Sequence, residues 1–84
     1  MKYEVSFSPN AEKDLKKLPD KFRLRVLLVL ARISANPFMG KKLDGKLSGH
    51  YSLRAWPYRV IYQIFKSKLL IVVVKIGHRQ GVYL

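Results

Sequence analysis

The sequence has 84 residues, no cysteine and a formal net charge of +12, and 49% of its residues are hydrophobic. This length suits a single small domain spanning residues 1–84, and the apolar content is too high for a disordered basic tail. Disulfides, thiolate metal sites and a membrane span are excluded, and no signal-peptide pattern opens the chain, so we expect a cytoplasmic protein without membrane association.

The first two predicted elements are a strand and a short helix. Apolar and polar side chains alternate from Lys2 to Phe7, as in a half-buried strand. Ser8-Pro9 then predicts a helix start, because the serine hydroxyl can cap a backbone N–H and proline at the first helical position loses no hydrogen bond. This helix has one apolar face and is predicted to end at Pro19.

A second helix is predicted from Lys21 to about Ala35, with Asp20 as its N-cap. Apolar residues repeat at helical spacing on the face that would cover a core: Phe22, Val26, Val29, Leu30 and Ile33. Leu24, Leu27 and Leu28 widen the apolar surface beyond what one small sheet needs. Either the helix lies along a groove of the sheet, or these leucines form an exposed strip that a partner helix covers.

The second helix is predicted to stop at Asn36-Pro37, and the stretch from Met39 to Gly49, with three glycines and three lysines, predicts a loop. Three antiparallel strands follow, the last of which is apolar on both faces from Leu69 to Val74 and is therefore central. The expected fold class is α+β in the order β-α-α-β-β-β. It is an antiparallel meander with the N-terminal strand added and both helices packed on one face.

Consecutive strand residues point to opposite faces of a sheet. Alternation therefore assigns the following residues to the faces that carry the basic side chains: His50, Ser52 and Arg54; Arg59, Ile61 and Gln63; Ile71, Val73, Lys75 and Arg79. We expect Arg54, Arg59, Lys75 and Arg79 to converge on the face that the helices leave open.

The charges are unevenly distributed along the chain. All acidic residues precede Gly45: Glu4, Glu12, Asp14, Asp20 and Asp44. The last forty residues hold seven Lys or Arg and no carboxylate, which favours a polyanion as ligand and argues against a hard-metal site or a paired-carboxylate mechanism. A field of one sign this strong also predicts an acidic protein partner.

Two segments resemble a known family. LRAWPYRVIYQI (residues 53–64) and IVVVKIGHRQGVY (residues 71–83) stand where members of the RelE/ParE toxin superfamily read like L-R-x-G-x-Y-R-V-x-Y and V-x-x-V-G-x-R-x-x-V-Y. With the order of elements, the resemblance covers nearly the whole chain. It implies the toxin of a toxin–antitoxin pair, blocked by a cognate acidic antitoxin. RelE-like members are endoribonucleases that cut mRNA in the ribosomal A site, and ParE-like members are DNA gyrase poisons.

The resemblance also implies residue roles. Arg59 and Arg79 match the phosphate-stabilising and leaving-group arginines of RelE-like enzymes, Arg54 matches a further basic position, and Tyr83 matches a terminal tyrosine that orients or stacks on the base beside the cut. In metal-free RNA cleavage the ribose 2′-OH attacks the adjacent phosphate, and the planar, permanently charged fork of arginine suits that phosphate. The alternatives are solvated or ion-paired arginines and a tyrosine that closes the sheet edge.

The general base stays open. The lysine that the best-known ribosome-dependent members carry falls here on Ser52, which cannot act as a base. His50 and His78 are candidates, because an unperturbed histidine exchanges protons near neutrality, and Lys46 is a further one. We also assign Lys46, Lys75 and Ser52 to RNA binding.

We therefore expect an endoribonuclease that needs neither a metal nor a small-molecule cofactor and acts on mRNA and the ribosome. Its first alternative is a non-catalytic gyrase poison, which the presence of Arg59, Arg79 and Tyr83 disfavours. The second is a decayed toxin that only binds RNA, which the missing lysine favours. Trp56 and Tyr58 are interpreted as turn and core aromatics rather than as a platform for a nucleobase.

Overall fold

The computed structural model describes residues 2–78, so Arg79 and Tyr83 lie outside the described residues. The helices and strands are β1 (Glu4–Phe7), α1 (Pro9–Lys17), α2 (Asp20–Ala35), β2 (Lys41–Lys42), β3 (His50–Ala55), β4 (Tyr58–Phe65) and β5 (Leu70–His78). The predicted α+β class and the order of its elements are confirmed. The stretch predicted as a loop before β3 also contains the short strand β2. Within residues 2–78, no helix is long and apolar enough to cross a membrane.

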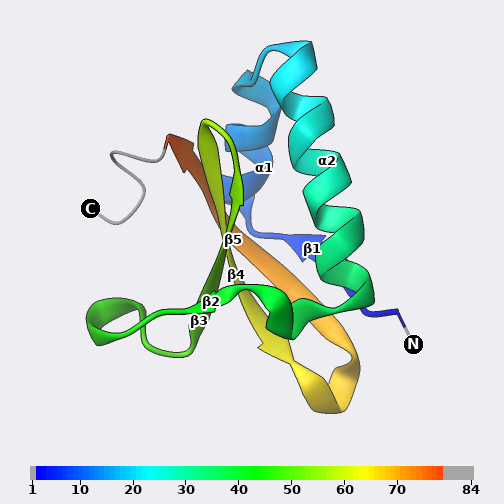
Figure 1. Ribbon diagram of the computed structural model, residues 1–84, viewed down its shortest axis with the longest axis vertical. Coiled ribbons are helices and arrows are strands. Elements are labelled where there is room, and N and C mark those ends of the chain that lie inside the picture. The colour runs from blue at the N-terminus through cyan, green and yellow to red at the C-terminus, as the bar shows by residue number, and fades with distance from the viewer. Residues whose placement is uncertain (1, 79–84) are drawn as a thin grey trace.

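The five strands form one sheet in the order β1-β5-β4-β3-β2. Strands β3 to β5 pair antiparallel as the predicted meander, and β2 adds to β3 antiparallel. Strand β1 pairs with β5 in parallel. Both helices lie on one side of this sheet, as predicted, and the loop between β2 and β3 lies on the other side (Figure 1). We call the two sides of the sheet the helix face and the open face.

The two helices start differently. Ser8 caps α1 as predicted, because its Oγ accepts a hydrogen bond of 3.2 Å from the backbone N–H of Ala11. In α2, Asp20 is the first helical residue, and Pro19 occupies the N-cap position without a side-chain cap, so the predicted cap at Asp20 is wrong. The Asp20 carboxylate instead pairs with Arg23 in the first turn, where a negative charge favours the helix dipole.

The main core lies between the helices and the helix face. Its buried residues are Ala11, Leu18, Val26, Val29, Leu30, Ile33, Ala55, Val60, Tyr62, Ile71, Val73 and Ile76. The open face has a smaller cluster, in which buried Leu43 and Ile61 pack with Leu47 and Val74. The loop after β2 therefore covers part of the open face and leaves the rest to other side chains.

Helix α2 does not bury all of its leucines. Leu24, Leu27 and Leu28 are 58%, 45% and 60% exposed. Their spacing of three and four residues places them together on the side of α2 that points away from the sheet. These leucines therefore do not lie in a groove of the sheet. They form an exposed strip, which was the second of the two predicted alternatives.

A β-bulge in β5 decides where Lys75 points. Ile61 of β4 pairs with Lys75, but the next residue, Tyr62, pairs with Val73, so Val74 is the extra residue. Strict alternation placed Lys75 on the same face as Val73, and that assignment is wrong. Val73 is buried in the main core, whereas Lys75 pairs with a residue of the open face. Without the bulge the Lys75 ammonium would point into apolar packing.

Helix α1 holds the chain around this bulge. The Ser8 hydroxyl donates to the carbonyl oxygen of Val74 over 3.1 Å, and the backbone N–H of Ile76 donates to the Asp14 carboxylate over 3.1 Å. Strand β1 ends at Phe7, so these side chains supply hydrogen-bond partners that β1 no longer offers to β5. The orientation of Lys75 thus depends on contacts from the opposite side of the sheet.

Candidate functional site

Three basic residues gather on the open face. Arg54 of β3 pairs directly with Arg59 of β4, and Lys75 of β5 pairs with Ile61, two residues further along β4. Directly opposed residues point to the same face with Cβ atoms about 5 Å apart, and diagonal neighbours are roughly 7–8 Å apart. Arg54, Arg59 and Lys75 therefore converge as predicted, while Arg79 lies outside the described residues.

This arrangement concentrates positive charge. Two arginines placed directly opposite each other repel, which destabilises the sheet locally. Strands β2 to β5 carry no carboxylate, and within residues 2–78 ion pairs form on the helices, between Lys16 and Glu12 and between Arg23 and Asp20. Such a site attracts an anion, and the fork of an arginine can hold two phosphate oxygens at once.

The two arginines differ in burial. Arg54 is exposed, whereas Arg59 is partly buried and its Nε atom is fully covered. Because buried atoms keep fewer orientations, the Arg59 guanidinium is held close to the sheet, while that of Arg54 can move over the surface.

Neither histidine lies beside the arginines. His50 lies on the open face, four residues along β3 from Arg54 and so about 13 Å away at its Cα. Its Nδ1 lies 3.4 Å from the carbonyl oxygen of Ser48. His78 pairs with Tyr58 and stands edge-on to its ring at 5.9 Å, at the end of the helix face. His78 therefore lies on the face opposite to that of the arginines.

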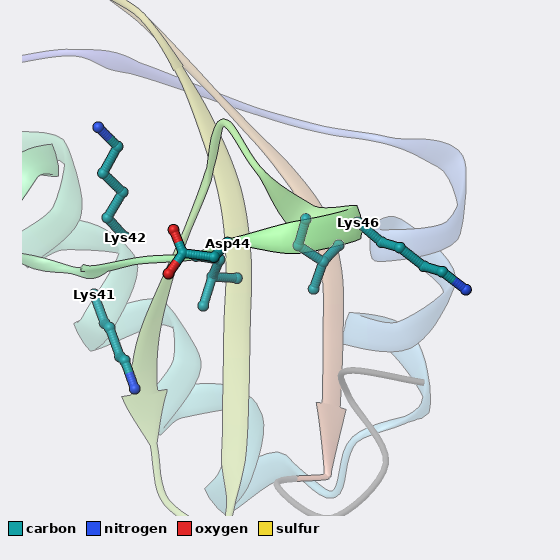
Figure 2. A pocket seen from close by; sticks show the side chains of 6 residues that line it. Lys41, Lys42, Asp44 and Lys46 are labelled. Atoms are coloured by element: carbon teal, nitrogen blue, oxygen red, sulfur yellow. The ribbon is translucent and has the colours of Figure 1, made fainter.

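Two further candidates for RNA binding are Ser52, which is buried, and Lys46, which lies in a turn. Ser52 is on the open face but only 2% exposed, so a substrate would meet its neighbours first. Lys46 belongs to the 3₁₀ turn Gly45–Leu47 and lines an open hollow of about 470 Å³ with Lys41, Lys42 and Asp44. Figure 2 shows the Lys46 side chain leaving this hollow on the side away from Lys41.

Sequence reasoning missed one basic residue of the open face. Lys41 of β2 pairs with Ser52, so both side chains point to the same face. The sequence does not reveal that Lys41 lies in a strand, because β2 has two residues and lies in a stretch with three glycines, which predicts a loop. Only the pairing with β3 shows that Lys41 belongs to the open face.

The aromatic residues near the β3–β4 turn have separate places. Tyr58 packs against Phe22 of α2 at 5.6 Å between ring centroids, so it is a core aromatic as predicted. Trp56 is 49% exposed in the turn, next to the strands that carry Arg54 and Arg59. Trp56 is therefore a turn aromatic, as predicted.

A buried tyrosine fixes the course of the chain into β2. The Tyr62 hydroxyl donates to the carbonyl oxygen of Pro37 over 2.6 Å, and burial raises the pKa of Tyr62 to about 12. A Cβ at Gly40 would overlap that hydroxyl oxygen, so the position before β2 requires glycine. Tyr62 thereby holds the chain at Pro37 and Gly40, just before β2.

The donor set offers little to a metal. Within residues 2–78, no three His, Asp or Glu side chains stand close enough to hold an ion. The fold and the open face together define a small α+β protein that carries arginines and lysines on the side of its sheet away from the helices.

Comparisons with known proteins agree with this class. A family profile described as "ParE toxin of type II toxin-antitoxin system, parDE" matches residues 5–83. The chain is 33% identical to toxin RelG of Mycobacterium tuberculosis over 99% of its own length and 98% of that relative. It is 31% identical to putative toxin RelE1 of Methanocaldococcus jannaschii, over 99% of this chain and 97% of that one.

Solved structures show the same fold. The toxin–antitoxin complex RelBE2 from Mycobacterium tuberculosis matches with a TM-score of 0.87 and 32% identity, over 94% of this chain and 100% of that chain. The archaeal RelE–RelB complex from Pyrococcus horikoshii matches with a TM-score of 0.80 and 27% identity, over 98% of this chain and 100% of that chain. The chain belongs to the RelE/ParE family of type II toxin–antitoxin toxins.

Proposed function

We propose that this toxin is a metal-independent endoribonuclease that cleaves mRNA in the ribosomal A site of translating ribosomes in the cytoplasm and so inhibits translation. The observation that carries the proposal is the direct pairing of Arg54 with Arg59 on the open face, on strands without a carboxylate. Two guanidinium groups about 5 Å apart at Cβ can hold one phosphodiester between them.

The proposed reaction needs three kinds of help. The ribose 2′-oxygen bonds to its neighbouring phosphorus while its proton passes to a base, and the bond from phosphorus to the 5′-oxygen breaks as that oxygen takes up a proton. The products are a 2′,3′-cyclic phosphate and a 5′-hydroxyl. Charge builds up on the phosphate oxygens in the transition state, and fixed cations stabilise it there.

The residues divide these tasks. Arg59 holds the phosphate and Arg54 adds a second, adaptable contact, while Lys75 raises the local positive potential. Arg79 as donor to the 5′-oxygen and Tyr83 as the group that stacks on a base follow from the resemblance to RelE-like enzymes. The base is the least defined of these groups, and His50 is the histidine on the same face as the arginines.

The test is to map message ends in a translating extract. The wild-type protein is expected to create new ends within codons of the translated messages. Any cleavage of purified RNA in a separate reaction without ribosomes should continue when a chelator of divalent ions is added. Arg59→Ala should slow cleavage by about 100-fold, the usual effect of losing one group that stabilises transition-state charge. Arg32→Ala removes the same charge from an exposed helix position and should cleave at the wild-type rate. An Arg59→Ala protein that cuts as fast as wild type would exclude this site.

A second candidate function is poisoning of DNA gyrase, which the description of the matching family profile favours. The same protein samples should therefore enter a gyrase supercoiling assay in parallel. Inhibited supercoiling with intact messages supports the gyrase function, and cut messages with full gyrase activity support the nuclease. Binding of RNA without either effect would indicate a decayed toxin.

The proposed partner is a small acidic antitoxin, as the complexes of similar toxins with RelB suggest. The exposed leucine strip of α2 (Leu24, Leu27 and Leu28) offers it a docking surface. Basic residues border the strip along one side: Lys21, Arg25 and Arg32. An apolar strip edged by positive charge complements an amphipathic helix with acidic flanks.

A further inference from the structure

Lys41 and its neighbour Lys42 point to opposite faces of the sheet. Lys41 pairs with Ser52 of the open face, whereas Lys42 pairs with Tyr51, whose ring packs against the main core. Both lysines are exposed, and both belong to the same two-residue strand. Their sequence positions differ by one, yet only Lys41 shares a face with the arginine pair.

The residues around Lys41 confirm this orientation. Gly40 faces the core, because a Cβ there would overlap the hydroxyl of buried Tyr62. Leu43 packs in the open-face cluster. Since alternate strand residues share a face, Lys41 lies with Leu43 and Lys42 with Gly40. Figure 2 shows the side chains of Lys41 and Lys42 leaving the strand in opposite directions.

The pairing places Lys41 at one end of a row across the sheet. The row consists of Lys41, Ser52, Ile61 and Lys75. With strands about 4.8 Å apart, the Cα atoms of the two lysines are separated by about 14 Å. The two residues between them are buried, and Leu43 and Leu47 pack in the same cluster as Ile61. Arg54 and Arg59 occupy the next row on the same face.

We propose that Lys41 binds an RNA phosphate that flanks the phosphate held by Arg54 and Arg59. The inference rests on the proposed function in taking RNA as the ligand. Lys41 is a diagonal neighbour of Arg54, roughly 7–8 Å away at Cβ, and is one strand further from Arg59. That distance suits a second phosphate better than the first.

The chemistry of lysine fits this task. A flexible stem with a compact ammonium follows a phosphate whose position varies, whereas the arginine fork suits the phosphate that must be fixed. Asp44 lines the same hollow and lowers the positive potential there, but Lys41 and Lys46 line it too. Lys42 borders the hollow from the same strand, and its side chain leaves in the direction opposite to that of Lys41 (Figure 2). Lys41 therefore acts as a binding residue that positions the RNA strand.

The test uses a short, fully 2′-O-methylated RNA, which lacks the attacking hydroxyl and reports binding alone. Affinity is measured by fluorescence anisotropy over a series of salt concentrations. Lys41→Ala should weaken binding about tenfold at low salt, the effect of one charge-assisted contact. It should also reduce the magnitude of the slope of log K against log salt by about 0.7, the contribution of one phosphate contact to a single strand.

Two further variants make the result specific. Lys42→Ala removes the same charge from the same strand but from the other face, so it should keep the wild-type slope. Lys41→Arg keeps a cation in place and should retain most of the affinity. Melting temperatures of all variants should match, because both side chains are exposed. Equal losses in Lys41→Ala and Lys42→Ala, or no binding of this RNA by the wild type, would overturn the proposal.

A cleavage assay separates this proposal from the proposed function. In a translating extract, Lys41→Ala should need about tenfold more toxin for half-maximal cleavage, with a near-normal rate at saturation. If the wild type cuts messages and Lys41→Ala behaves like Lys42→Ala, the Lys41 site alone fails. If the wild type binds RNA through Lys41 but cuts no message, the nuclease fails and the Lys41 site stands.

Discussion

Replacing the exposed leucines of α2 tests how the antitoxin is held. Leu24, Leu27 and Leu28 are about half exposed in the free protein. Burying a whole leucine side chain is worth about 1.5–3 kcal/mol, so covering the exposed half of these three side chains could contribute roughly 2–5 kcal/mol to binding. Since binding also orders side chains, we expect a net loss of about 2.7 kcal/mol, or about 100-fold in affinity, when all three become glutamine.

Glutamine suits the experiment because it favours helices and leaves the net charge unchanged. The affinity of the triple variant for the proposed acidic antitoxin is measured by calorimetry. The free variant should melt no lower than wild type and should cleave messages equally well, because these leucines take no part in the core. Phe65→Gln, an exposed apolar residue at the end of β4, serves as the control and should bind normally. Unchanged affinity of the triple variant would refute the docking surface.

Three further predictions concern the scaffold of the site. Tyr62→Phe should cost about 1–2 kcal/mol of unfolding free energy through the lost bond to Pro37. The pKa of Tyr62 is about 12 in the folded protein and 10.0 when unperturbed, so the stability that the neutral hydroxyl contributes is complete below pH 10 and is lost as the pH rises toward 12. By pH 12 wild type should lose about 2–3 kcal/mol of unfolding free energy relative to Tyr62→Phe. Urea titrations in which the difference between the two proteins stays constant above pH 10 would contradict this. Gly40→Ala should lower the melting temperature, because its Cβ displaces the Tyr62 hydroxyl, and a variant as stable as wild type would show that the chain before β2 adjusts freely. Asp14→Ala should cost about 1–2 kcal/mol and speed amide exchange at Ile76, while Asp14→Asn, which keeps an acceptor oxygen, should cost less; equal effects of the two would exclude the hydrogen bond as the cause.

Local patterns predicted the order of the elements well. The strand β1, both helices and the meander follow from alternation, capping residues and prolines, all of which act over a few residues. The Ser8 cap and the convergence of Arg54 with Arg59 are examples, because cross-strand neighbours in a meander follow from the two strands and their turn. The parallel pairing of β1 with β5 depends on contacts across the whole chain.

The missed features arise from long-range contacts. The bulge at Val74 is held by Ser8 and Asp14, residues more than sixty positions earlier, so alternation alone wrongly placed Ile71 and Val73 on the same face as Lys75. Strand β2 exists through its pairing with β3, so Lys41 was hidden in a predicted loop. Sequence position beside Arg79 suggested His78 as a base, but His78 pairs with Tyr58 on the helix face, opposite to Arg54 and Arg59.

The proposed function requires that Arg54 and Arg59 act together on one phosphate. The most direct measurement is a double-mutant cycle on the rate of message cleavage, with Arg54→Ala, Arg59→Ala and the double variant. Each single change should slow cleavage, with the larger effect for the more buried Arg59, and the double variant should lose less than the product of the two effects, because both groups serve the same step. If the two changes slowed cleavage independently, so that their effects multiplied fully, or if the double variant cleaved at the wild-type rate, the two arginines would not act on the same phosphate.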